Sequence, residues 1–223
     1  MNFMDAIPGL KVLDEAGIKK LYFTALEVLE RTGVSVPQKE TCELLNDAGA
    51  KVEDEVAYVP AWLVEKAVNT APKQIIIYTI DGQPAMRLTN GNFYFGTGEN
   101  TVFMIDGSTG ERRRWTKKDV TNAVVIQDQM ENLDFMTPLG LVSDYNPQTS
   151  HLYQFEIMIT YSNKPPMFSA YDRQGVIDIL EMATVIKSPA EIEKKPFWMN
   201  LMASTSPLVH SEDVLDKLLY SSD

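Results

Sequence analysis

The sequence predicts an α/β protein in which a helical region with antiparallel strands precedes a series of strand–helix (βα) units. Three strand-like segments begin at Phe135, Pro166 and Phe197, which are 31 residues apart each time, and a helix-forming segment follows each of them. About 30 residues is the usual length of a βα unit. The three segments are apolar runs without clean alternation, as expected for a parallel sheet covered by helices. The sequence therefore indicates a (β/α) barrel or an open doubly wound sheet.

The N-terminal region is predicted to be helical. Residues 12–32 carry apolar side chains at the spacing of one helical face, and Gly33 follows where a glycine commonly ends a helix. A second helix is expected over residues 39–48, closed by Gly49. A third is expected over residues 60–70, since the proline at its start is favoured in a first helical turn.

Short strands are expected between and after these helices, because β-branched and aromatic residues are concentrated there. They cover residues 58–59, 73–80, 92–96 and 101–105, with turn signals at 81–82, 90–91 and 106–110. The polar loop from Gly96 to Asn100 is interpreted as a tight turn between antiparallel strands. Its alternative role is to reach over the mouth of a barrel, since its glycines allow a close backbone approach.

The character of the sequence changes at Thr116. Thr116 and Asp119 resemble a capping box, which opens a helix to about Met130. The βα units then place strands over residues 135–142, 166–170 and 197–203, and helices over residues 146–162, 172–186 and 212–220. We therefore divide the chain into an N-terminal helical and antiparallel β region, residues 1–131, and the βα units, residues 132–223.

Composition excludes several classes of function. The chain has 20 Lys and Arg residues against 31 Asp and Glu residues, and the net charge of −11 argues against nucleic acid or an anionic membrane as a partner. With one cysteine and two histidines, this chain alone can build neither a disulfide nor a Cys/His zinc site. The first residues lack the features of a signal peptide, and no run approaches the about 18 apolar residues of a membrane helix. We therefore expect a cytoplasmic protein.

A combination of motifs follows a fixed order along most of the chain. The motifs are VLERTGVSV (28–36), LLNDAGAKVEDEVAYVPAWLVEKAVNTAP (44–72), FGTGEN (95–100), IDGSTGERRRWTKKDV (105–120), the helix with Tyr153–Glu156 followed by Lys164-Pro165, and SPLVHSEDVLDKLL (206–219). Together they resemble the N-terminal half of the trimethylamine methyltransferase family.

The resemblance implies a TIM barrel with an N-terminal extension, so that this chain would hold a partial TIM (β/α) barrel of about three βα units. It also implies transfer of a methyl group from a methylated amine, such as trimethylamine or glycine betaine, to a corrinoid (cobalamin) carried by a separate protein. The chain itself would bind no cofactor directly, and we expect a homo-oligomer. Members of the family are longer than this chain, so the competing hypothesis is a non-catalytic fragment or binding module that lacks the rest of the barrel.

Functional residues of barrels lie at the carboxyl ends of the strands and in the loops that follow them. Aromatic faces and carboxylates suit a cationic amine, and amide, hydroxyl or imidazole donors suit the carboxylate of a betaine. The expected catalytic residues are Asn200 and His210, and the expected substrate-binding residues are Glu99, Asn100, Asp144, Tyr171 and Ser204.

These candidates also have structural interpretations. Asp144 would only shape the loop before a helix, and Tyr171 would belong to the core or the surface. Asn200 would be a buried amide with its hydrogen bonds satisfied, and His210 would be an exposed residue near a helix start. The run Arg112–Arg114 is interpreted as a solvated edge, with docking to the acidic surface of a partner as the alternative.

Overall fold

The computed structural model describes residues 11–222, and the chain forms two compact units. The first unit contains the residues up to Ala71 together with Thr205–Glu212. The second unit contains Pro72–Ser204 and the residues from Asp213 onward. The division at residues 131 and 132 inferred from the sequence stays a prediction.

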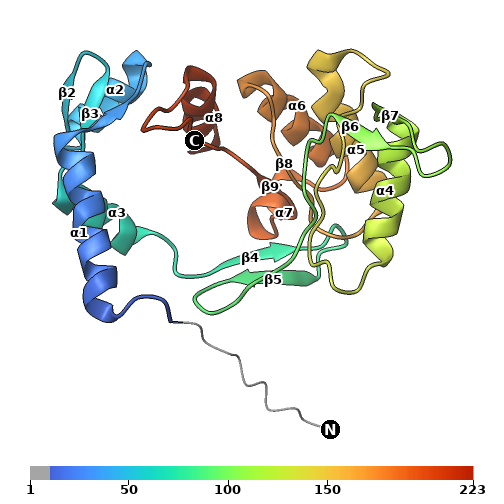
Figure 1. The fold of residues 1–223 in the computed structure, drawn as a ribbon, viewed down its shortest axis with the longest axis horizontal. Helices are drawn as coiled ribbons and strands as arrows, with labels where there is room; N and C mark the ends of the chain where they lie inside the picture. Colours follow the sequence, from blue (N-terminus) through green and yellow to red (C-terminus); the bar gives the residue numbers. More distant parts are fainter. Residues whose placement is uncertain (1–10, 223) are drawn as a thin grey trace, which may run out of the picture. The chain divides into compact units, whose positions relative to one another are not determined.

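The first unit combines helices with a small antiparallel sheet (Figure 1). Its elements are α1 (Glu15–Arg31), β1 (Val34–Ser35), α2 (Lys39–Asp47), β2 (Lys51–Glu53), β3 (Val56–Tyr58) and α3 (Ala61–Thr70), with the strand order β1-β3-β2. The Asp14 side chain caps α1 by accepting a hydrogen bond from the Gly17 amide at 2.7 Å. Gly33 follows α1 with a φ of +78°, a conformation that favours glycine. The three helices predicted for this region are confirmed.

The second unit begins with two antiparallel hairpins. One pairs β4 (Ile75–Tyr78) with β5 (Pro84–Leu88), and the other pairs β6 (Phe103–Ile105) with β7 (Arg112–Arg114). The strand predicted over residues 92–96 is wrong, because β4 takes β5 as its partner and residues 92–100 form no strand. The interpretation of residues 96–100 as a tight turn is also wrong, since this segment runs beside a distant one.

Four segments of the second unit run parallel to one another. Residues 95–101 lie beside residues 134–141, where the Thr101 amide donates to the Leu139 carbonyl at 3.1 Å. On the other side, an isolated parallel bridge joins Met136 to Pro166. The third and fourth segments are β8 (Met167–Phe168) and β9 (Met199–Asn200), which pair in parallel. The predicted strand over residues 135–142 forms only isolated bridges, which makes it less regular than expected.

Helices alternate with these parallel segments, and Figure 1 shows β8 and β9 side by side. The helices are α4 (Lys117–Gln129), the short 3₁₀ helix η1 (Pro147–Thr149), α5 (Ser150–Tyr161), α6 (Arg173–Thr184), α7 (Pro189–Lys194) and α8 (Glu212–Ser222). The capping box of Thr116 and Asp119 is confirmed at the start of α4. Helix α7 was not predicted, although Ser188 and Glu191 form a capping box at its start.

The core of the second unit lies between the parallel segments and the helices. Phe155 of α5 contacts Phe168 of β8 with ring centroids 5.1 Å apart, and both side chains are buried. The α/β class is confirmed, and residues 11–222 form no closed barrel. None of the helices in the described part of the chain is long and apolar enough to cross a membrane.

Candidate functional site

The carboxyl ends of the four parallel segments meet at one edge of the second unit, because parallel strands all point the same way. Glu99 and Asn100 lie in the first segment, and Asp144 and Tyr171 follow the second and third. All the predicted site residues except His210 belong to the second unit. We call the neighbourhood of Glu99 and Asn100 the carboxyl edge. Ligand sites of α/β proteins commonly lie in this position.

Glu99 carries the clearest chemical signal at the carboxyl edge. Its side chain is half-buried, and its Oε2 atom is buried without a hydrogen-bond partner among the described residues. Burial raises the pKa of the Glu99 carboxyl above its usual range, since a charged group loses hydration there. A carboxylate in this state gains most from a cation, which restores the lost solvation.

Hydrogen bonds from distant segments hold the backbone around Glu99. Asn100 has a φ of +56°, and its amide donates to the Pro138 carbonyl at 2.9 Å. The buried Gln154 of α5 donates from Nε2 to the Asn100 side-chain oxygen at 3.2 Å and to the Gly140 carbonyl at 2.8 Å. Hydrogen bonds therefore fix the Asn100 backbone, and the Asn100 side-chain oxygen already accepts one from Gln154.

The peptide before Glu99 is fixed in the same way. The buried Thr137 hydroxyl donates a hydrogen bond to the Gly98 carbonyl at 2.7 Å. Its oxygen also lies 2.7 Å from the hydroxyl oxygen of Thr97. Thr97 in turn donates to Gln127 of α4 at 2.8 Å. These polar residues were not predicted to support a site. Their sequence signal is weak, because each lies in a different element.

Two further candidates have structural contacts. The Asp144 carboxylate accepts a hydrogen bond from the Lys117 amide at 2.8 Å, so it caps the first turn of α4. The Tyr171 ring lies 4.5 Å from the ring of the buried His151, and Tyr171 remains partly exposed. Ser204 is exposed at the end of the fourth segment.

Asn200 borders an apolar cavity of the second unit. The cavity has a volume of about 550 Å³ and is walled mainly by apolar side chains of β8, α6, α8 and the residues that flank β9, including Phe168, Ile179, Trp198 and Tyr220. The Asn200 side-chain oxygen accepts a hydrogen bond from the Ala170 amide at 3.3 Å. Its amide nitrogen is the polar group that the residue can offer to a ligand.

His210 belongs to the first unit, where its amide donates to the Ser35 carbonyl at 3.0 Å. Its Nδ1 atom is buried and has no partner among the described residues. The structure therefore groups His210 with β1 and does not place it with Glu99. Its predicted catalytic role stays a prediction.

The structure also places two titratable residues that were not chosen as site residues. His151 is 4% exposed, and both ring nitrogens lack a hydrogen-bond partner among the described residues. The buried Lys217 of α8 donates to the Ala170 carbonyl at 2.8 Å. Burial lowers the pKa of both groups below their usual values. A lysine in an amphipathic helix is usually exposed, so the sequence offered no signal for its burial.

The fold and the carboxyl edge define the chain as an α/β protein with parallel segments and a desolvated carboxylate at their common end. The family model described as trimethylamine methyltransferase matches residues 1–221. The chain therefore belongs to the trimethylamine methyltransferase family.

Three relatives whose names give different substrates have similar sequence identities to this chain. A trimethylamine methyltransferase of Desulfitobacterium hafniense (strain DSM 10664 / DCB-2) is 25% identical over 93% of this chain and 43% of its own length. A glycine betaine methyltransferase of Desulfitobacterium hafniense (strain Y51) is 24% identical over 96% and 45%. A proline betaine:corrinoid methyltransferase of Eubacterium limosum is 23% identical over 94% and 44%. The chain thus spans less than half the length of these curated relatives.

Proposed function

We propose that this chain is the substrate-side part of a methyltransferase that moves a methyl group from a methylated amine to a corrinoid carried by a separate protein. Membership of the family supports the reaction type, and the name of the Eubacterium limosum relative supports a corrinoid acceptor. The single observation in the structure that carries the proposal is Glu99, whose desolvated carboxylate suits a cationic substrate.

We infer further that the four parallel segments are part of a TIM barrel. A complete barrel of this kind has eight parallel strands and carries its active site at their carboxyl ends. The segment 95–101 adds one parallel member before the three predicted from the 31-residue spacing. This arrangement supports a location of the substrate near Glu99.

Methylated amines place simple demands on these residues. A tertiary amine at neutral pH and a quaternary amine both carry a positive charge, which the Glu99 carboxylate would attract. The corrinoid of the partner would supply the nucleophile for the methyl group. The chain then has to hold the nitrogen–carbon bond in line with the acceptor and keep water away, and such positioning is a large part of the rate enhancement in two-substrate reactions.

The competing proposal is a binding module that holds an amine without catalysing the transfer. The partial coverage of the relatives, 43% to 45% of their length, is the observation that favours it. Both proposals predict that the chain binds a methylated amine through Glu99, and only the first predicts methyl transfer.

An anaerobic assay separates the two proposals. The purified chain would be mixed with a corrinoid protein in its cob(I)alamin form and with trimethylamine, glycine betaine or proline betaine, and methylation would be followed by the corrinoid absorbance. We expect methylation that depends on one of the amines. Amine binding in a calorimeter without methylation would support the binding module, and neither binding nor methylation would contradict both proposals.

A further inference from the structure

The β6–β7 hairpin and the turn after it hold an unusual concentration of positive charge. Residues 112–118, RRRWTKK, contain five of the 20 basic residues of a chain whose net charge is −11. A positive region of this kind in an acidic protein is a local feature that an acidic partner can recognise.

Arg113 is the arginine of this run that serves the fold. Its Nε donates to the Asp106 carboxylate at 2.8 Å, and its terminal nitrogens donate to both carboxylate oxygens of Asp119 at 2.6 and 2.9 Å. Arg112 and Arg114 lie on the other face of the hairpin, because side chains alternate along a strand. Within residues 11–222, neither of them forms an ion pair.

The Arg112 and Arg114 guanidinium groups pack against the exposed ring of Phe103. The Arg112 guanidinium lies 3.7 Å from the centroid of the Phe103 ring, and that of Arg114 lies 5.7 Å from it. Phe103 is 39% exposed and Ile105 is 63% exposed on the same face. We call this surface of Phe103, Ile105, Arg112 and Arg114 the arginine face. Arginine and aromatic residues dominate the energetics of protein interfaces, and a stacked guanidinium keeps its edge free for carboxylates.

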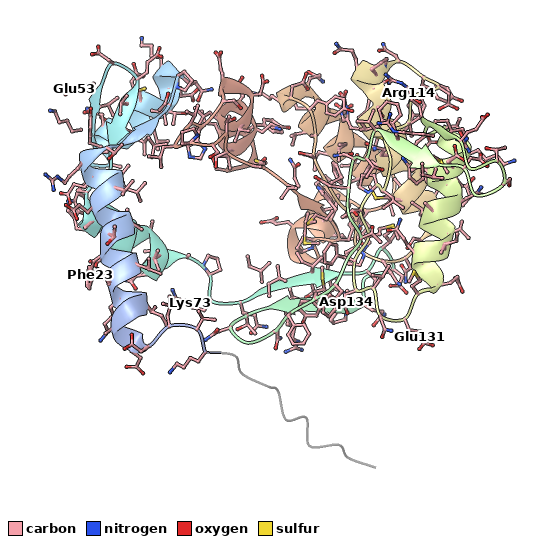
Figure 2. The ribbon with its side chains drawn as sticks, in the orientation of Figure 1. Phe23, Glu53, Lys73, Arg114, Glu131 and Asp134 are labelled. Carbon is pink, nitrogen blue, oxygen red and sulfur yellow. The ribbon has the colours of Figure 1, made fainter. Side chains whose placement is uncertain are left out.

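The arginine face lies on the same side of the second unit as the carboxyl edge. Strand β6 follows closely after Thr101, which pairs with Gly140 near the end of the second parallel segment. Figure 2 shows Arg114 at one end of this unit and Asp134, at the start of the segment 134–141, at the other end. A protein that contacts the arginine face therefore approaches the end of the unit that carries Glu99.

We propose that the arginine face docks the protein that carries the methyl acceptor, through a surface of that protein that presents carboxylates around an apolar contact. The proposal rests on the proposed function, because the acceptor has to reach an amine held at the carboxyl edge. The charge pattern supports a protein partner of this chemistry, since the two exposed arginines have no acidic partner within residues 11–222 and are available for intermolecular ones. The surrounding negative charge of the chain would disfavour other orientations of an acidic partner.

Binding measurements test the arginine face independently of activity. The full chain would be titrated with a recombinant corrinoid protein from a trimethylamine or glycine betaine methyltransferase system, at low and at physiological salt. The double variant Arg112→Gln/Arg114→Gln should bind more weakly, with a Kd about tenfold higher, and its Kd should depend less on salt. The Kd of the variant Arg112→Lys/Arg114→Lys should lie between those of the unsubstituted chain and the double glutamine variant, because lysine keeps the charge and loses the planar stacking.

A matched control removes the same charge elsewhere. In Arg31→Gln/Arg87→Gln two exposed arginines outside the arginine face are replaced, and we expect its Kd to stay within about twofold of the unsubstituted chain. If the double variant in the hairpin loses its fold by circular dichroism, the single variants Arg112→Gln and Arg114→Gln replace it.

The two proposals fail in different ways. An unchanged Kd in the arginine-face variants, or no binding by the unsubstituted chain, would overturn the docking surface. Methyl transfer that is insensitive to these variants would leave the proposed function intact. Binding that depends on the arginine face, without methyl transfer from any amine, would support the surface and contradict the proposed catalysis.

Discussion

At the scale of single residues, Glu99 differs from two other carboxylates of the second unit in its hydrogen bonding. Asp144 and Asp172 both accept backbone hydrogen bonds at helix starts, from Lys117 and Gly175 respectively, at 2.8 Å. Glu99 instead keeps a buried oxygen without a partner in the described structure. A group left in this state lowers stability and is therefore a sign of a binding role.

Replacing Glu99 by glutamine should raise stability and remove amine binding. The raised pKa means that the ionised carboxyl is unfavourable in the folded chain, so Glu99→Gln should unfold at a slightly higher temperature at pH 7. This difference should shrink as the pH falls through the raised pKa of Glu99 in the folded chain, and vanish below the unfolded value of about 4.3, where the carboxyl is neutral in both states. Thermal unfolding between pH 4 and 8 measures it. Glu131→Gln, at an exposed position, is the control and should show no such gain.

The affinity for an amine should depend on the ionised form of Glu99 and should therefore fall as the pH is lowered. A quaternary amine keeps its charge at every pH, so its affinity should fall only as Glu99 becomes protonated. Because burial raises the pKa of Glu99, the loss should begin above the ordinary glutamate value of about 4.3. Calorimetric titration with glycine betaine from pH 8 to 4 measures the midpoint. A flat profile would exclude Glu99 as the partner of the cation.

At the scale of elements, the start of α4 joins a capping box to an ion pair. The Asp119 carboxylate accepts from the Thr116 amide at 2.9 Å and from Arg113 of β7. The Arg113 guanidinium, with further hydrogen bonds from Thr116, holds the pKa of Asp119 far below its usual range. The helix start and the hairpin with the arginine face therefore depend on the same carboxylate.

Replacing Asp119 by asparagine should destabilise the chain by about 1 kcal/mol or more, because it removes the negative charge that accepts hydrogen bonds from Arg113. Since the folded pKa of Asp119 is depressed, its contribution is present above the unfolded value of about 3.9 and is lost as the pH falls below it. The difference between Asp119→Asn and the unsubstituted chain should therefore shrink below pH 4. Urea unfolding at pH 7 and pH 3 measures the change, and the exposed Asp47→Asn serves as the comparison.

The second parallel segment depends on a close approach at Gly140. A side-chain carbon built on Gly140 would lie 2.1 Å from the ring of the buried Trp115. Gly140→Ala should therefore cost about 1–3 kcal/mol of stability and disturb the carbonyl that accepts from Gln154. At Gly107 the new carbon would have no atom within 4 Å from the described residues other than the adjacent ones, so Gly107→Ala should be nearly neutral. Equal midpoints in urea for the two variants would contradict the packing argued for this segment.

At the scale of the whole molecule, β9 is an edge. In the described structure it pairs with β8 alone, and the flanking Leu201 is 38% exposed. An apolar strand edge without a partner promotes association between chains. We therefore expect self-association at micromolar concentration, in line with the predicted homo-oligomer.

A charge beside β9 should oppose this association. Leu201→Lys keeps the hydrogen bond from the residue 201 amide to the Phe168 carbonyl and changes only the side chain. Light scattering after gel filtration should show a larger monomer fraction for this variant. Leu21→Lys, on the exposed side of α1, should leave the fraction unchanged. A monomeric unsubstituted chain would show that this edge does not drive association.

The sequence by itself determined the elements whose causes are local. The helices near residues 12–32, 116–130 and 172–186 and the 31-residue spacing of the βα units follow from periodicity and capping over short distances. The motifs in their order also determined the family, which the match over residues 1–221 confirms.

The tertiary structure alone decided which distant segments meet. Residues 95–101 carry turn-like glycines, yet they run beside residues 134–141, because backbone groups of one segment bond to those of the other. The tertiary structure also buries the Glu99 carboxyl, while Asp144 reaches the start of α4 and His210 joins the first unit. Desolvation and hydrogen bonding across such distances depend on packing, which periodicity and local capping do not specify.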